Sequence, residues 1–373
     1  MTDTFIIADN IISPLGYTSE ENFEQLQLLN SGIREHDDPM SDQPFFAALL
    51  DKEKPLLPGD DANGYTRFEQ LLIASVSDAV QRAGIDAGDK ETILIVSSTK
   101  GNISLLEKGN SEAPAISLAA SAKKIAAHFG FANAPIVISN ACISGLLAIL
   151  TGMRLVRSGQ YKQAVVTGAD VISKFVLSGF QSFQAVSAER CKPFDAQRKG
   201  INLGEGAGTV ILSCQRKNGN DIKVAGGSVS NDANHISGPS RTGEELNLAI
   251  GNAMKAAGVS SQDIDYISAH GTATLYNDEM ESKAITLAGL QGVPINSFKA
   301  YYGHTLGAAG LIESILAIRS MQANLILPSL GYNEQGVSQP LNICTKLQPA
   351  ILNNCLKTAS GFGGCNAAIV FSK

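Results

Sequence analysis

The sequence contains no tryptophan, and only 6% of its 373 residues are aromatic. Charged residues make up 17%, well below the roughly 25% of an average soluble protein. The net charge of −6 argues against a general nucleic-acid binder, which would carry a basic field. Small and apolar residues dominate instead, with 36 glycines and 44% hydrophobic residues, so the chain can bury a large core.

Patterns for membrane insertion, export and metal binding are also missing. There is no stretch of about 18 apolar residues, so no transmembrane helix is expected. The first ten residues carry Asp3 and Asp9 and no basic segment, which argues against a signal peptide. None of the six cysteines forms a C-x-x-C pair, and no set of ligands has metal spacing. We expect a cytoplasmic protein with free thiols and no metal.

Three pairs of segments recur in the same order along the chain. They are a periodic helix, a glycine and a buried strand (68–97 and 246–269), a special residue before a small-residue helix (140–149 and 302–315), and a glycine-rich turn entering a strand (204–212 and 361–371). An internal duplication explains this order, and chance similarity of Ala/Gly-rich helices is the alternative. Alternating helices and strands predict an α/β fold. The polar stretch 215–221 divides it into halves 1–218 and 219–373.

Cys142 follows the strand-like segment 135–141 and precedes a helical pattern. A helix N-terminus favours the thiolate, which is the nucleophilic form of cysteine, and its free N–H groups can stabilise an oxyanion. A lone cysteine is more often a small buried residue, so both interpretations stay open for this position alone.

Two histidines occupy related positions in the second half. His270 follows the strand 266–269, and His304 begins the helix that the repeat pairs with the one after Cys142. If the halves share a fold, a pseudo-twofold axis brings Cys142 and His304 to equivalent places, and His270 reaches the same centre. Such a cluster can activate a thiol and stabilise negative charge. A hydrogen-bonded structural residue is the alternative for each histidine.

Taken together, the motifs resemble the β-ketoacyl-acyl-carrier-protein synthases of the Cys–His–His type, over nearly the whole chain. This resemblance implies a thiolase-like fold, a duplicated five-layer α-β-α-β-α body whose N-terminal half carries the cysteine and whose C-terminal half carries both histidines. The motifs are Ile12-Ser-Pro-Leu-Gly16, Asn140-Ala-Cys-Ile-Ser-Gly145, Lys192-Pro-Phe-Asp195, Leu203-Gly-Glu-Gly-Ala-Gly208, His270-Gly-Thr-Ala-Thr274, Gly303-His-Thr-Leu-Gly-Ala-Ala-Gly310 and Gly361-Phe-Gly-Gly364.

The resemblance implies a role for each matching residue. Cys142 would accept an acyl group as a thioester, while His270 and His304 would hold the malonyl thioester carbonyl during decarboxylation. The backbone N–H groups of Cys142 and Phe362 would form the oxyanion hole, and Phe362 would gate the acyl site. The reaction is a decarboxylative Claisen condensation with malonyl-acyl carrier protein, in fatty-acid or specialised polyketide or polyene biosynthesis.

Further residues are assigned by the same resemblance. Lys299 and Glu281 would form a buried pair near the histidines, which is costly to break from one side. Asp278 and Glu313 would support the histidines. The ligands of the pantetheine arm would be Thr272, Thr274 and Ser237.

The implied acyltransferase works as a homodimer with acyl carrier protein and needs no cofactor beyond the phosphopantetheine on that partner. A small basic patch could receive the acidic carrier, and solvated surface charge is the alternative; its residues are Arg67, Arg190, Lys192, Arg198 and Lys199.

Two other functions compete with this one. The first is a non-catalytic partner subunit similar to chain-length factors, which usually lack the cysteine. The second is a thiolase or CoA-dependent acyltransferase, which would need a second catalytic cysteine, and Cys365 is poorly placed for it.

Overall fold

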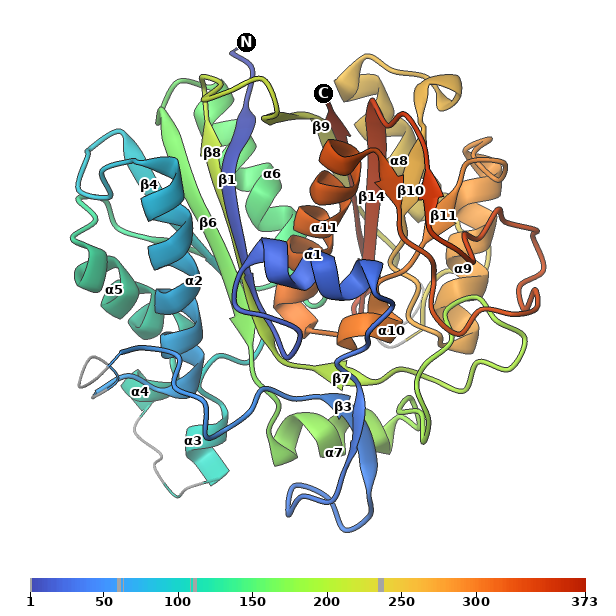
Figure 1. Ribbon diagram of the computed structural model, residues 1–373, viewed down its shortest axis with the longest axis horizontal. Helices are drawn as coiled ribbons and strands as arrows, with labels where there is room; N and C mark the ends of the chain where they lie inside the picture. The colour runs from blue at the N-terminus through green and yellow to red at the C-terminus, as the bar shows by residue number, and fades with distance from the viewer. Residues whose placement is uncertain (1, 59–61, 63, 108, 110–112, 234–237) are drawn as a thin grey trace.

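The computed structural model describes residues 2–58, 62, 64–107, 109, 113–233 and 238–373. Ten strands form one long sheet that consists of two groups of five (Figure 1). The first group has the order β5-β4-β6-β8-β1. Its members are β1 (Phe5–Ile12), β4 (Thr92–Ser97), β5 (Ile136–Ile138), β6 (Gln163–Asp170) and β8 (Gly206–Ser213).

The second group repeats this arrangement with the order β11-β10-β14-β15-β9. Its members are β9 (Ile222–Asn231), β10 (Tyr266–Ser268), β11 (Ile295–Asn296), β14 (Asn354–Gly361) and β15 (Cys365–Ser372). β1 and β9, the first strands of the two halves, lie side by side where the two groups meet. They pair over only two positions. The strand order therefore has the twofold repetition that the sequence predicts.

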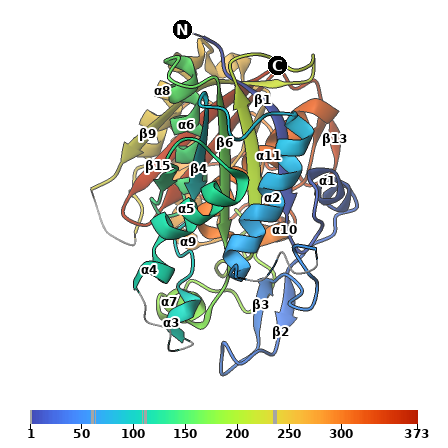
Figure 2. The same ribbon diagram turned by 90° about the vertical axis from the view of Figure 1, so that its left-hand side faces the viewer.

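Two helices fill the space between the strand groups and form the central layer (Figures 1 and 2). They are α6 (Ser144–Arg157) and α11 (Ala309–Ala323), which follow Cys142 and His304 in the chain. They approach closely because each carries a glycine at the crossing. A Cβ on Gly145 would lie 2.5 Å from the Leu311 nitrogen, and one on Gly310 would lie 3.0 Å from the Leu146 nitrogen.

Helices cover the outer faces of both strand groups, which completes five layers (Figure 1), and Figure 2 looks onto the outer layer that holds α2 and α5. One outer layer holds α2 (Arg67–Ala83) and α5 (Leu118–Phe129), and the other holds α8 (Glu244–Ala257) and α9 (Leu275–Leu287). The predicted glycine ends of the helices are confirmed, since Gly84 and Gly258 follow α2 and α8 in the left-handed conformation. The thiolase-like α/β fold is thus confirmed.

Shorter elements complete the body. A three-stranded sheet contains β2 (Arg34–His36), β3 (Phe45–Ala48) and β7 (Leu203–Gly204), and a two-stranded one contains β12 (Leu325–Ile326) and β13 (Gln348–Pro349). The remaining helices are α1 (Ser19–Gln27), α3 (Ser104–Glu107), α4 (Ala113–Ile116), α7 (Lys174–Ser182), α10 (Lys299–Tyr302) and the 3₁₀ turns Ser261–Asp263 and Leu306–Ala308.

The strand before Cys142 differs from the prediction. We expected a buried strand over 135–141, whereas β5 covers Ile136–Ile138 and its residues are only half-buried. The reason is its position, because β5 is the last strand of its group and has β4 alone as a neighbour. Within the described part of the chain, none of the helices has the length and apolar character needed to span a bilayer.

Candidate active site

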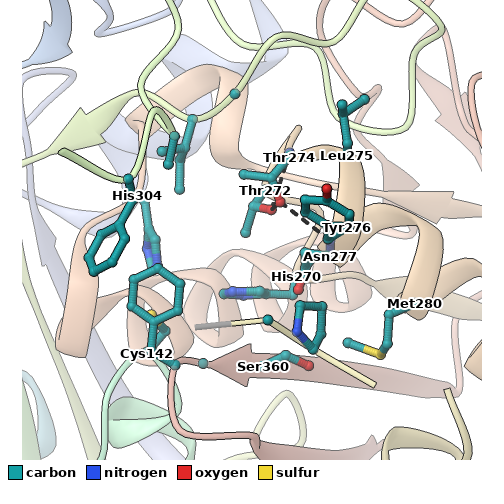
Figure 3. Close-up of a pocket in the computed structure, with 18 of the residues that line it drawn as sticks. Cys142, His270, Thr272, Thr274, Leu275, Tyr276, Asn277, Met280, His304 and Ser360 are labelled. Carbon is teal, nitrogen blue, oxygen red and sulfur yellow. Dashed lines mark hydrogen bonds between the residues drawn. The ribbon is translucent and has the colours of Figure 1, made fainter. Parts of the chain in front are cut away.

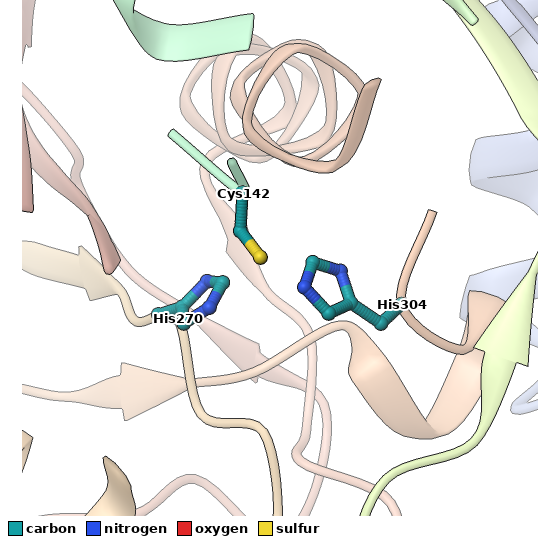
Figure 4. Close-up of side chains that lie close together, drawn as sticks. All are labelled: Cys142, His270 and His304. Atoms are coloured by element: carbon teal, nitrogen blue, oxygen red, sulfur yellow. The ribbon is translucent and has the colours of Figure 1, made fainter. Parts of the chain in front are cut away.

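Cys142 lies in a tight turn between β5 and α6. Ala141 has a φ of +43°, which is uncommon for a residue with a side chain. The Ser144 hydroxyl fixes this turn, because it accepts from the Asn140 nitrogen and donates to the Ala141 oxygen, both at 2.7 Å. Figure 4 shows the Cys142 sulfur directed toward the imidazoles of His270 and His304.

His304 occupies the corresponding turn of the second half. It follows Gly303, whose φ is +65°, and its backbone pairs with the glycine-rich motif. The His304 nitrogen donates to the Asn202 oxygen at 2.7 Å, and its carbonyl accepts from Gly204 at 3.1 Å. A Cβ on Gly204 would lie 1.9 Å from the Tyr302 oxygen, so only glycine allows this approach. The Leu203-Gly-Glu-Gly motif therefore serves to position His304.

His270 enters the site from the end of β10. Glu281 on α9 binds the turn with both carboxylate oxygens, which accept from the backbone nitrogens of His270 and Gly271 at 2.8 Å each. The same carboxylate accepts from the Thr358 hydroxyl on β14 at 2.7 Å. The turn that holds the imidazole is therefore tied to two further elements.

The three side chains converge, as the sequence predicts (Figure 4). The Cys142 sulfur and one ring nitrogen from each of His270 and His304 all lie within 4.8 Å of one another. The two imidazoles meet edge to face, with centroids 5.4 Å apart and an interplanar angle of 83°. A single thioester can contact all three groups at these distances.

Burial lowers the pKa of both imidazoles well below the ordinary value, and the positive charges of Lys299 and Lys357 act in the same direction. Both rings are therefore neutral near pH 7, and each carries one N–H. Burial also raises the pKa of the Cys142 thiol to about 12, with Cys365 adding to the effect and Lys299 opposing it. The effect of the helix N-terminus, which favours the thiolate, is opposed here, because α6 begins two residues later and desolvation of the sulfur raises its pKa.

The buried ion pair next to the histidines has a different acidic partner from the one expected. Lys299 contacts the carboxylate of Glu313 rather than that of Glu281. Its Nζ also lies 3.1 Å from the His270 oxygen and 3.4 Å from His270 Nδ1. Glu281 is committed to backbone N–H groups, so it is not available to the lysine.

Asp278 supports the loop that follows His270. Its carboxylate accepts from the Phe194 nitrogen at 2.7 Å and the Ala273 nitrogen at 3.2 Å, and burial raises its pKa to about 6. The Arg198 guanidinium lies 4.0 Å from the Asp278 carboxylate and donates to backbone carbonyls such as that of Asp195. Arg198 is only 7% exposed. Arg198 is therefore not part of the expected basic surface patch.

The cluster opens into a pocket of about 470 Å³ (Figure 3). Thr272 and Thr274 line it, with their hydroxyls 2.8 Å apart. Ser237, the third expected pantetheine ligand, lies outside the described residues. Phe362 is 41% exposed and forms an aromatic wall with Phe180, with their centroids 5.9 Å apart. Its backbone N–H acts on the Cys142 thiol and lowers the thiol pKa, against the larger effect of burial.

The sequence interpretation missed Asp170, at the end of β6. This buried carboxylate accepts from the Ser98 hydroxyl and the Gly307 nitrogen, both at 2.7 Å, and thereby fixes the segment after His304. Burial raises its pKa. An acidic residue that ends an apolar strand was the available signal. Lys357, in the middle of β14, was missed as well.

Comparison with known protein families gives two adjoining matches. The model for the N-terminal domain of beta-ketoacyl synthases matches residues 6–218, and the model for their C-terminal domain matches residues 222–333. The chain belongs to the beta-ketoacyl synthase family. This beta-ketoacyl synthase is 29% identical to the 3-oxoacyl-[acyl-carrier-protein] synthase 2 of Vibrio cholerae serotype O1, over 97% of each chain.

Solved structures agree with this family. The synthase resembles a chain of the ketosynthase (ApeO) in complex with its chain length factor (ApeC) from Xenorhabdus doucetiae, with a TM-score of 0.89 and 26% identity over 100% of this chain and 98% of the other. It is equally similar to a chain of the ishigamide ketosynthase/chain length factor, with a TM-score of 0.88 and 26% identity over 100% and 99% of the two chains.

Proposed function

We propose that this protein is a 3-oxoacyl-acyl-carrier-protein synthase that condenses an acyl thioester with malonyl-acyl carrier protein. The observation that carries the proposal is the convergence of one thiol and two neutral imidazoles in one pocket. The near full-length similarity to a curated 3-oxoacyl-acyl-carrier-protein synthase supports it. A chain-length-factor role would not require these three groups to meet.

In the first half-reaction, Cys142 attacks the carbonyl carbon of the acyl thioester. The raised thiol pKa means that the proton must leave during attack, and a neutral imidazole within 4.8 Å can accept it. The pantetheine thiolate leaves and takes that proton. The N–H of Phe362, together with that of Cys142, stabilises the tetrahedral oxyanion. The product is an acyl group bound to the Cys142 sulfur.

In the second half-reaction, His270 and His304 donate N–H groups to the carbonyl oxygen of the malonyl thioester. The C–C bond to the carboxylate breaks, carbon dioxide leaves, and its electron pair forms an enolate. The two donors stabilise that negative charge in a site with little water. The enolate carbon then attacks the acyl carbonyl, and the bond to Cys142 breaks. The Cys142 thiolate takes a proton from solvent, and a 3-oxoacyl thioester is released.

Other groups position these reactants. Lys299 donates to Nδ1 of His270, so Nδ1 carries no proton and the single N–H of the neutral ring is on Nε2. Glu281 holds the His270 turn, and Glu313 holds Lys299. Thr272 and Thr274 bind the amides of the pantetheine arm in the pocket. Phe362 covers the entrance to the acyl site.

The protein acts as a cytoplasmic homodimer, and the six thiols, all free, suit a reducing compartment. Acyl carrier protein delivers both substrates, in fatty-acid or specialised polyketide biosynthesis. The halves 1–218 and 219–373 each supply one side of the site.

Intact mass spectrometry tests the proposal directly. The protein is incubated with a panel of acyl-acyl carrier proteins, and an acyl adduct is expected on the parent and not on Cys142→Ala. Addition of malonyl-acyl carrier protein should remove the adduct and yield a 3-oxoacyl product. Absence of any adduct with a folded parent protein would favour the chain-length-factor alternative.

A further inference from the structure

Lys357 is a second buried lysine beside the active site. It lies in the middle of β14, is 0% exposed, and pairs in register with Ser268 on β10 and Ile369 on β15. Burying an ammonium group is expensive, and a methionine would fill a similar volume without that cost. Packing alone therefore does not account for a lysine at this position.

The surroundings of the Lys357 Nζ consist of acceptors. The carbonyl oxygens of Ser268, Ala269 and Thr358 lie at 3.1, 3.2 and 2.8 Å, and Glu313 Oε2 lies at 2.8 Å. An ammonium group offers three donors and no acceptor, which suits this site. Burial lowers the pKa of Lys357, and the nearby Glu313 carboxylate opposes this effect. A neutral amine would direct its lone pair at one of these oxygens, so the geometry favours the charged form.

Lys357 reaches His270 by two routes. One route is the backbone, since Ser268 and Ala269 directly precede His270. The other passes through Glu313, whose two carboxylate oxygens contact Lys357 and Lys299 separately. Lys299 donates to Glu313 Oε1 and to the His270 carbonyl oxygen, and its third proton faces His270 Nδ1 at 3.4 Å. Lys357 occupies the other Glu313 oxygen and thereby fixes the carboxylate that holds Lys299.

We propose that Lys357 is a positioning residue for the condensation, which through Glu313 and the carbonyls before His270 keeps Lys299 and the imidazole arranged so that Nε2–H faces the substrate carbonyl. This inference rests on the proposed function and adds a residue to it. Lys357 does not line the pocket, so it acts through its neighbours.

The charges around His270 come from several elements. They are Lys299 on α10, Lys357 on β14, Glu281 and Asp278 on α9, Glu313 on α11, and the titratable Cys142 and His304. Removal of Lys357 takes one positive charge from this set. The imidazoles should then bind protons more readily, so the neutral, active form should be lost at a higher pH than in the parent.

The test measures malonyl-acyl carrier protein decarboxylation from about pH 5 to about pH 9 in the parent, Lys357→Met and Lys357→Arg. We expect the acidic limb of Lys357→Met to move up by about 1 pH unit, because one positive charge is lost. The rate above that limb should fall about tenfold, because the imidazole of His270 is no longer held with its Nε2–H toward the substrate carbonyl. Acyl loading of Cys142, followed by intact mass, should stay within about twofold, because that step depends less on the donors. Lys357→Arg keeps the charge and should keep the parental limb.

Controls separate this effect from simple loss of stability. Lys255→Met removes an exposed lysine on α8 and should leave both the profile and the loading rate unchanged. A structural role for Lys357 would lower the unfolding temperature and reduce both steps equally, without moving the limb. If Lys357→Met does not fold, Lys357→Gln replaces it, since glutamine still donates to the carbonyls.

The outcomes are distinct. A folded Met or Gln variant with the parental acidic limb overturns the proposal, and so does failure of both variants to fold, which would assign Lys357 to core stability alone. An inactive parent would instead contradict the proposed function. An upward shift in the limb with loading preserved supports the positioning role.

Discussion

The imidazoles of His270 and His304 lie edge to face, 5.4 Å between centroids, although 34 positions separate them in the chain. One comes from the end of β10 and the other from the turn before α11. Their shared burial keeps both neutral, so both can donate to one carbonyl oxygen. In the proposed mechanism this pair forms the decarboxylation centre, and its function is separable from that of the thiol.

His304→Ala should separate the two half-reactions. Loss of one donor removes stabilisation of the enolate, so decarboxylation should fall by about 100-fold or more. Acyl loading should persist at a reduced rate, because Cys142 and the Phe362 amide remain. Product acetyl-acyl carrier protein and the acyl adduct are measured in parallel. Equal loss of both activities would contradict the separate roles.

Cys142→Gln tests the same separation from the other side. The variant cannot carry an acyl group, but both imidazoles remain in place. It should therefore keep measurable decarboxylation of malonyl-acyl carrier protein while condensation is absent. A folded variant with no decarboxylation would show that the histidine pair does not act independently of the thiol.

Alkylation of Cys142 should depend steeply on pH. Since burial raises the thiol pKa to about 12, the reactive thiolate fraction should rise about tenfold per pH unit up to about pH 10 without a plateau. The rate with iodoacetamide is followed by intact mass, with Cys142→Ala reporting background from the other thiols. A plateau near neutral pH would instead indicate a resting thiolate.

The crossing of α6 and α11 makes Gly145 intolerant of a side chain. A Cβ there would lie 2.5 Å from the Leu311 nitrogen, so Gly145→Ala should lower the free energy of unfolding by about 2 kcal/mol or more. The matched control is Gly251→Ala on α8, where a Cβ meets nothing within 4 Å. That change should increase stability by about 0.5 kcal/mol, because alanine favours the helix. Chemical denaturation of both variants checks the difference.

The buried histidines should make stability depend on pH. Their folded pKa lies well below about 6.5, the value expected in the unfolded chain, so their contribution is complete above about pH 6.5 and is lost as the pH falls toward the folded pKa. Each such histidine contributes a slope of about 1.4 kcal/mol per pH unit in that window. His304→Asn should therefore show a shallower decline than the parent between about pH 6 and pH 5. Identical slopes would contradict the burial effect.

The sequence by itself determined the α/β class, the repeated order of segments and the meeting of Cys142, His270 and His304. The fold class follows from hydrophobic periodicity and glycine at helix ends, which are local signals. The expected meeting of the three side chains rested on the internal repeat and on the family resemblance. The family resemblance also pointed correctly to the fold.

Only the tertiary structure decided which charged groups pair and how the site is charged. Lys299 contacts Glu313 instead of Glu281, and Lys357 joins the same carboxylate from a different strand. Desolvation of the Cys142 sulfur raises the pKa of its thiol in spite of the nearby helix. Partner choice and burial depend on packing between segments far apart in the chain, and a linear pattern of residue types does not carry that information.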